Sequence, residues 1–281
     1  MHKFLRAIGF SDITKKDLEM ILDEVITRPE IMKITKDSEG NEFAELSGSF
    51  AANAGITVRG TYQEDDSFHM DYYYPYVFGT SITTNEQIDV EKHAEKESYA
   101  GVCDEVNLGV TLIFYIQNVA DYLAETNRHL SKIHYGAMLA GLSTEGKILC
   151  PVVERKKNDV PAIQKNDRHN QLIAQAREGD EDAIESLTLE DMDTYALLSQ
   201  RVMKEDIFSI VKSTFMPFGI ESDQYTVLGE IIDCVTMENK LTHEKLYGMK
   251  LLCNNIQFDV CINEKDLLGE PATVSYTHLT L

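Results

Sequence analysis

The sequence predicts an α+β protein that has an N-terminal helix with a largely antiparallel sheet, a helical connector and a small C-terminal β unit. Three observations predict this class. Residues 14–27 repeat their apolar positions with the period of a helix, residues 30–76 alternate apolar and polar positions between turn signals, and residues 225–262 return to strand-like runs. The length of 281 residues exceeds the roughly 150 residues of one typical domain, so we expect more than one unit.

The first helix is expected at residues 14–27. Its apolar positions lie three and four residues apart and form one stripe that consists of Leu18, Ile21, Leu22, Val25 and Ile26. Thr14 with Asp17 can cap its start, and Pro29 follows its end.

The alternating segment at residues 30–76 predicts an antiparallel meander. Turn signals divide it at residues 37–40, at Gly55 and at residues 63–67. Each strand of the meander should therefore pair with the next strand in the chain.

Residues 110–116 are an almost continuous apolar run, which predicts a strand covered on both faces. Asn118 can cap a short helix after it. Residues 133–142 and 147–153 are expected to form a hairpin around the turn at residues 143–146.

The pattern of apolar residues then changes twice, first to the period of helices and then back to that of strands. A polar linker at residues 154–161 leads into helices expected at 163–178, 180–187, 188–203 and 204–215. Strands expected at 225–235, 246–254 and 256–262, with a helical turn at 264–268, suggest part of a small barrel or a sheet edge. We therefore divide the chain into an α+β domain (1–153), a linker and helical segment (154–215), a C-terminal β unit (216–271) and a tail (272–281).

The composition restricts the partners. There are 47 acidic and 26 basic residues, a net charge of −21. Because such a surface repels phosphate, nucleic acid and anionic membranes are not expected as partners, whereas a basic protein or a small ligand is.

The cysteines and the first residues predict a cytoplasmic location. The five cysteines are an odd number without a close pair, which is typical of free thiols in a reducing compartment. The first residues lead into a polar helix and not into an apolar run, so no secretory signal is expected, and no apolar stretch approaches the ~20 residues of a spanning helix.

The densest candidate site is the aromatic cluster at residues 72–76, preceded by His69. On a strand, Tyr72, Tyr74 and Tyr76 share one face and Tyr73 takes the other, so three phenols can line a groove and stack on a planar ligand. The alternative is that these tyrosines only fill a half-buried strand, which the β-propensity of tyrosine favours.

Metal, nucleophile and cofactor signatures are not expected. His69 with Asp71, and Glu91 with His93 and Glu95, lack a second ligand pair at recognisable spacing. No glycine-rich phosphate or dinucleotide loop follows a strand, and Cys150 beside a proline is better explained as a structural thiol. No catalytic residue, metal or cofactor is therefore assigned.

Residues 178–193 concentrate acidic side chains without a basic one. They predict either a docking face for a basic partner or an ordinary solvated helix face, and the second explanation is the more economical. The candidate docking residues are Glu181, Asp182, Glu185, Glu190 and Asp191.

Five segments together resemble an uncharacterised bacterial domain-of-unknown-function family, family 3881. The segments are residues 1–11, 215–219, 223–225, 258–263 and 266–271, and the likeness extends from residue 1 to about residue 271. The resemblance implies a cytoplasmic bacterial protein with no assigned reaction and no catalytic residue to carry over.

Residues 272–281 resemble the translated read-through of a sequencing adaptor and are predicted not to be native sequence. The alternative is a genuine terminal strand, because Val274, Tyr276 and the threonines favour strands. If the tail is not native, we expect it to be poorly packed and His278 to ligate nothing.

The sequence favours a non-catalytic interaction or regulatory protein acting through its surface. The alternative is an enzyme or binding protein for a small neutral or cationic ligand at the face of residues 72–76. A deep pocket gathering the phenols with His69 or a buried carboxylate favours the alternative, whereas a flat face favours the interaction protein.

Overall fold

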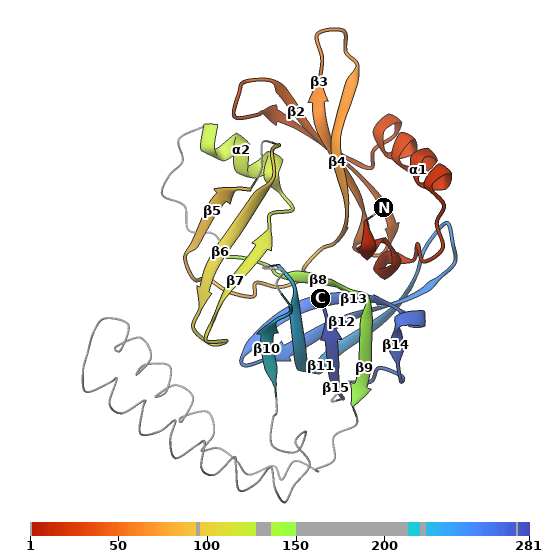
Figure 1. Cartoon of the computed structure of the whole chain (residues 1–281), viewed down its shortest axis with the longest axis vertical. Helices are drawn as coiled ribbons and strands as arrows, with labels where there is room; N and C mark the ends of the chain where they lie inside the picture. The colour runs from red at the N-terminus through yellow and green to blue at the C-terminus, as the bar shows by residue number, and fades with distance from the viewer. Residues whose placement is uncertain (1, 94–95, 128–135, 150–212, 220–222, 274) are drawn as a thin grey trace, which may run out of the picture.

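The computed structural model describes residues 2–93, 96–127, 136–149, 213–219, 223–273 and 275–281. In this part the chain forms three β-sheets, two α-helices and two short 3-10 helices (Figure 1). The coarse α+β class is confirmed, with strands predominating. The predicted linker and most of the helical connector lie outside the described residues, but the helix expected to end at Phe215 is wrong at that end, because Thr214–Pro217 is strand β10.

The first sheet is the predicted meander. Its four strands are antiparallel in sequence order, β1 (Ile31–Lys36), β2 (Glu42–Ala51), β3 (Ala54–Tyr62) and β4 (Phe68–Val77). The turn expected at Gly55 is wrong by a few residues, because Gly55 lies inside β3, where a Cβ would come within 2.1 Å of the Gly48 carbonyl oxygen.

Both faces of the first sheet are covered. Helix α1 (Lys15–Thr27), capped by the Thr14 hydroxyl, and the 3-10 helix η1 (Lys3–Ile8) pack on the face that carries Leu46 and Val58. Helix α2 (Val119–Asn127) packs on the opposite face against Phe43. The interior positions of β2 and β3 are buried for this reason.

The second sheet contains β5 (Ile88–Lys92), β6 (Tyr99–Glu105) and β7 (Val110–Tyr115). The expected strand at residues 110–116 and the helix after Asn118 are both present. The expectation that this strand is covered on both faces is wrong, because β7 is an edge strand in which only Leu112 is buried.

The third sheet has eight strands. They are β8 (Ala140–Ser143), β9 (Glu145–Leu149), β10 (Thr214–Pro217), β11 (Tyr225–Glu238), β12 (Lys245–Cys253), β13 (Ile256–Asn263), β14 (Leu267–Leu268) and β15 (Tyr276–Thr280). The three predicted C-terminal strands are confirmed as β11, β12 and β13, and the helical turn after them is η2 (Glu264–Asp266). Strands from both sides of the division predicted at residue 153 share this sheet.

The hairpin expected around residues 143–146 is wrong. Strand β8 pairs in parallel with β13, while β9 pairs with β15 and β14, so the two consecutive strands lie toward opposite ends of the sheet. Thr144 alone separates them. The sheet therefore curls until its ends approach each other. Its strand order is an open path, so the described strands form no closed barrel, where the sequence suggested part of a small barrel or a sheet edge.

Residues 276–280 of the tail are packed as a strand of the third sheet. Strand β15 pairs with β9 on one side and β11 on the other, and the side chains of Thr277 and Leu279 are fully buried. The expectation of a poorly packed tail is therefore wrong.

The three sheets are held together by three apolar clusters. The largest joins the third sheet to Leu112 of the second, another joins η1 and α1 to the first sheet and to Cys261 of β13, and a small one joins Phe43 to Tyr99 and α2. No helix in the described part of the chain is long and apolar enough to cross a membrane.

Candidate functional site

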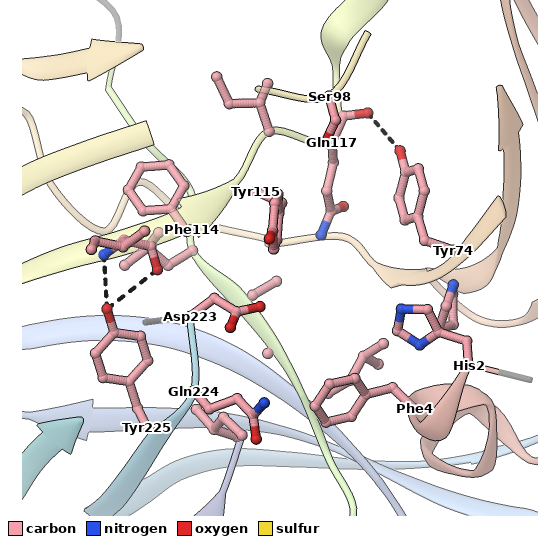
Figure 2. Close-up of a pocket in the computed structure, with 18 of the residues that line it drawn as sticks. His2, Phe4, Tyr74, Ser98, Phe114, Tyr115, Gln117, Asp223, Gln224 and Tyr225 are labelled. Carbon is pink, nitrogen blue, oxygen red and sulfur yellow. Dashed lines mark hydrogen bonds between the residues drawn. The ribbon is translucent and has the colours of Figure 1, made fainter. Parts of the chain in front are cut away.

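A cavity of about 800 Å³ lies where the three sheets meet. Its walls come from η1, β3, β4, β7 with the segment that follows it, β8 and β11, and Figure 2 shows its interior. The aromatic residues that line it are Phe4, Tyr72, Tyr73, Tyr74, Phe114, Tyr115, Phe215, Tyr225 and Phe258. Leu112, Ile113, Ile116, Leu139 and Leu142 add aliphatic surface, so most of the wall is apolar.

The phenols of β4 alternate as the sequence predicts. Tyr72 and Tyr74 pair with Arg59 and Thr57 of β3 and share their face of the sheet, whereas Tyr73 packs with the apolar cluster on the opposite face. Because β4 is the edge strand of its sheet, side chains from both of its faces reach the cavity.

Two of the predicted binding residues lie outside the cavity wall. Tyr76 is only 2% exposed, and its hydroxyl oxygen would be 2.7 Å from a Cβ at Gly55, so the absent side chain of this glycine is what makes room for the ring. His69 is exposed near the other end of β4, beyond a β-bulge opposite Arg59 and Gly60. The structure therefore brings together Tyr72 and Tyr74 but not His69 or Tyr76.

Arg59 holds in place the part of the cavity wall that Tyr72 and Tyr74 form. Its side chain is 3% exposed, and its Nη1 and Nη2 donate to the hydroxyls of Tyr72 and Tyr74, each at 2.8 Å. Nη2 also lies 3.3 Å from Glu45 Oε1 and within 3.0 Å of the carbonyl oxygens of Ile116 and Gln117. The guanidinium thus ties β3 and β4 to the segment between β7 and α2.

Glu45, which is also buried, completes this connection. It lies opposite Arg59 on β2, and its second carboxylate oxygen accepts a hydrogen bond from the Ala120 amide in the first turn of α2. An anion suits this position because the first amides of a helix have no partner within the helix. Burial raises the pKa of Glu45, and Arg59 and the Ala120 amide oppose that rise.

Tyr225 joins the opposite wall to the second sheet. Its hydroxyl accepts from the Ile113 amide at 2.7 Å and donates to the Ile113 carbonyl at 3.2 Å, as Figure 2 shows. These contacts satisfy backbone groups of the edge strand β7. The Tyr225 ring packs 4.8 Å from that of Phe215, which meets Phe258 edge-on.

Three polar side chains point into the open space of the cavity from different elements. Figure 2 shows the Asp223 carboxylate, the Gln117 amide and the His2 imidazole directed toward its centre. Burial lowers the pKa of His2, with Lys3 acting in the same direction, so the imidazole is neutral at pH 7. Lys3 is at the exposed rim, where its Nζ donates to Gln224 Oε1 at 2.7 Å.

The buried phenols predict a loss of stability at alkaline pH. Burial raises the pKa of Tyr72 and Tyr74, and burial with nearby Glu30 raises the pKa of Tyr76 to about 12. An unfolded tyrosine loses its proton near pH 10, so above that pH the unfolded chain binds fewer protons than the folded chain. The free energy of unfolding should therefore fall as the pH rises from 9 to 11.

Urea unfolding at successive pH values measures this fall. Each unit of pKa difference is worth about 1.4 kcal/mol, so Tyr76→Phe should show a shallower fall than the wild type. An identical fall in the two proteins would contradict the assignment to Tyr76.

The other predicted candidates have separate outcomes. His93 reaches the cavity rim, where its ring lies edge-on to that of Tyr115 with the two ring centres 5.4 Å apart. Glu95 and all five residues of the acidic docking face lie outside the described residues. Within the described ranges, no three His, Cys, Asp or Glu side chains gather as metal ligands. Burial raises the pKa of Cys253 and of Cys261 to about 12, which makes them poor nucleophiles.

Sequence reasoning missed Arg59, Tyr115, Gln117, Asp223 and Tyr225. One signal could have located two of them, Asp223 and Tyr225. Four of the five segments that carry the family resemblance contribute to this cavity, through His2 to Phe4, Phe215, Asp223 to Tyr225 and Phe258. A second signal is the pair of opposite charges inside the first meander. Glu45 and Arg59 lie directly across from each other in neighbouring strands.

Comparison with known proteins identifies one family. A protein-family sequence model described as "Domain of unknown function, E. rectale Gene description (DUF3881)" matches residues 5–275. This match agrees with the family resemblance found in the sequence. No curated protein and no solved structure matches the chain significantly.

Proposed function

We propose that this chain, which belongs to the DUF3881 family, is a binding protein for a small planar molecule held in the cavity between its three sheets. The observation that carries the proposal is the cavity itself, which has the size and the mostly apolar, aromatic lining of small-molecule sites. A few polar groups directed inward, from Asp223, Gln117 and His2, would orient the bound molecule.

The rigidity of the walls supports this proposal. The hydroxyls of Tyr72 and Tyr74 donate to the carbonyl oxygens of Glu97 at 2.7 Å and Gln117 at 3.0 Å, so both rings are held in place before any ligand arrives. A prearranged wall lowers the ordering cost of binding. The criterion for ligand binding over a flat interaction face is met in part. The cavity gathers Tyr72 and Tyr74 with the half-buried Asp223 carboxylate, whereas His69 and Tyr76 do not line it.

The surface role favoured by the sequence rests on residues 181–191, outside the described part of the chain. The cavity is therefore the better-supported basis for a function. A cytoplasmic location belongs to the same proposal, and the free cysteines Cys103, Cys234, Cys253 and Cys261 support it.

A single introduced tryptophan tests the proposal, because the chain has none of its own. Tyr115 lines the cavity and is 48% exposed, so Tyr115→Trp places a reporter at the rim. Titration with a panel of quinolines, indoles, purines and flavins should give a saturable change in its emission for at least one compound. Met20→Trp, on the exposed face of α1, is the matched control and should not respond.

A second variant tests whether the response comes from the cavity. The Gln117 side chain points inward, so Gln117→Phe in the Tyr115→Trp background should crowd the space beside the reporter and weaken the response. The proposal fails if no compound changes the emission, if the Met20→Trp control responds equally, or if Gln117→Phe leaves the affinity of the responding compound unchanged.

A further inference from the structure

We infer that the ligand of this cavity is a planar aromatic cation, whose positive charge is recognised by Asp223; this inference rests on the proposed function. The inference rests on the charged groups of the cavity wall, among whose described residues Asp223 has no basic partner. The Asp223 carboxylate is half-buried and directed into the open space. Among the residues that the structure describes, none forms a hydrogen bond or an ion pair with this carboxylate.

The basic groups of the wall do not neutralise Asp223. The charge of Arg59 is matched by Glu45 within the wall, where the two side chains are 3.3 Å apart. Lys3 donates to Gln224 and lies 4.9 Å from the centre of the Phe4 ring, on the solvent side. The pKa of His2 lies below its usual 6.5, because burial and Lys3 lower it more than Asp223 raises it, so the imidazole is neutral at pH 7. His93 packs against Tyr115 at the rim.

The aromatic lining favours the same ligand class. The faces of phenylalanine and tyrosine rings attract cations, most strongly where water is excluded. Phe4, Phe114 and Tyr115 lie around the space into which Asp223 points (Figure 2). The net charge of −21 also attracts cations to the protein over longer distances.

Three bicyclic probes of similar shape test the inference by isothermal titration calorimetry at pH 7.5. They are N-methylquinolinium, a cation; quinoline, which is neutral; and quinoline-2-carboxylate, an anion. In the wild type the cation should bind about tenfold more tightly than the other two. Asp223→Asn should remove this preference by weakening the binding of the cation more than that of quinoline. Its circular dichroism spectrum and urea midpoint, measured separately, show whether the variant is folded.

Lys3→Gln is the matched charge control. It removes an exposed basic side chain that donates to Gln224, the residue after Asp223, so it should leave the preference for the cation intact or strengthen it. The inference is overturned, while the proposed function stands, if quinoline or the anion binds as tightly as the cation or if Asp223→Asn keeps the preference. Binding of none of the three probes would overturn the inference, and it would overturn the proposed function as well if no compound of the wider panel changes the Tyr115→Trp emission.

Discussion

Replacing Arg59 with methionine should lower the free energy of unfolding by about 3–5 kcal/mol, the usual result of removing one partner of a buried ion pair. The substitution leaves the Glu45 carboxylate without its counter-charge at a buried position. It also removes the donor to the hydroxyls of Tyr72 and Tyr74. Urea unfolding at pH 7, followed by circular dichroism, measures the change.

Lys33→Met is the matched control for this prediction. Lys33 also joins the first sheet to α2, through Asp121 at 2.5 Å, but both side chains of that pair are more than 40% exposed. Exposed pairs contribute about 0–1 kcal/mol, so the control should be nearly neutral. Combining Arg59→Met with Glu45→Gln should recover part of the loss, because no buried charge is then left unpaired. Equal losses in the free energy of unfolding for Arg59→Met and Lys33→Met would contradict the proposal that Arg59 connects β3 and β4 to the segment before α2.

Leu279→Ala should destabilise the protein by about 2–5 kcal/mol. Leu279 is fully buried in the cluster of the third sheet, on a strand that pairs on both sides. Replacing it leaves a cavity that the neighbouring strands cannot fill without moving. The measurement is the urea midpoint at constant slope.

Leu268→Ala is the matched control, because that leucine is 69% exposed on the edge strand β14 and should change stability by less than about 0.5 kcal/mol. Comparing the two variants also tests whether residues 272–281, which the sequence predicts to be non-native, contribute a packed strand. A loss at Leu279 no larger than that at Leu268 would show that the tail does not pack as a strand of this sheet.

Local patterns in the sequence were enough to predict the first helix, the meander and the three C-terminal strands. In each of these the period of apolar residues and the turn chemistry agree, and each strand pairs with its neighbour in the chain. The pairing of β8 with β13 could not be predicted this way, because parallel partners distant in sequence leave no local signal. The hairpin expected around residues 143–146 was wrong for that reason.

The candidate site was predicted only in part. Alternation along β4 placed Tyr72 and Tyr74 on one face, but the sequence could not show that a second sheet and η1 close over them. The burial of Tyr76 depends on a close approach to Gly55, which is a property of the folded meander. Asp223 lies just before β11 and Tyr225 begins that strand, far along the chain from β4, so only the fold brings them to the phenols.

A crystal structure of the wild type with N-methylquinolinium decides whether this cavity holds the cation. We expect the ring to occupy the cavity between β4, β7 and η1, with its cationic nitrogen directed at the Asp223 carboxylate and its face against Tyr115 or Phe114. Density for the probe only on the outer surface, with the cavity holding ordered water alone, would contradict the claim that this cavity is the binding site.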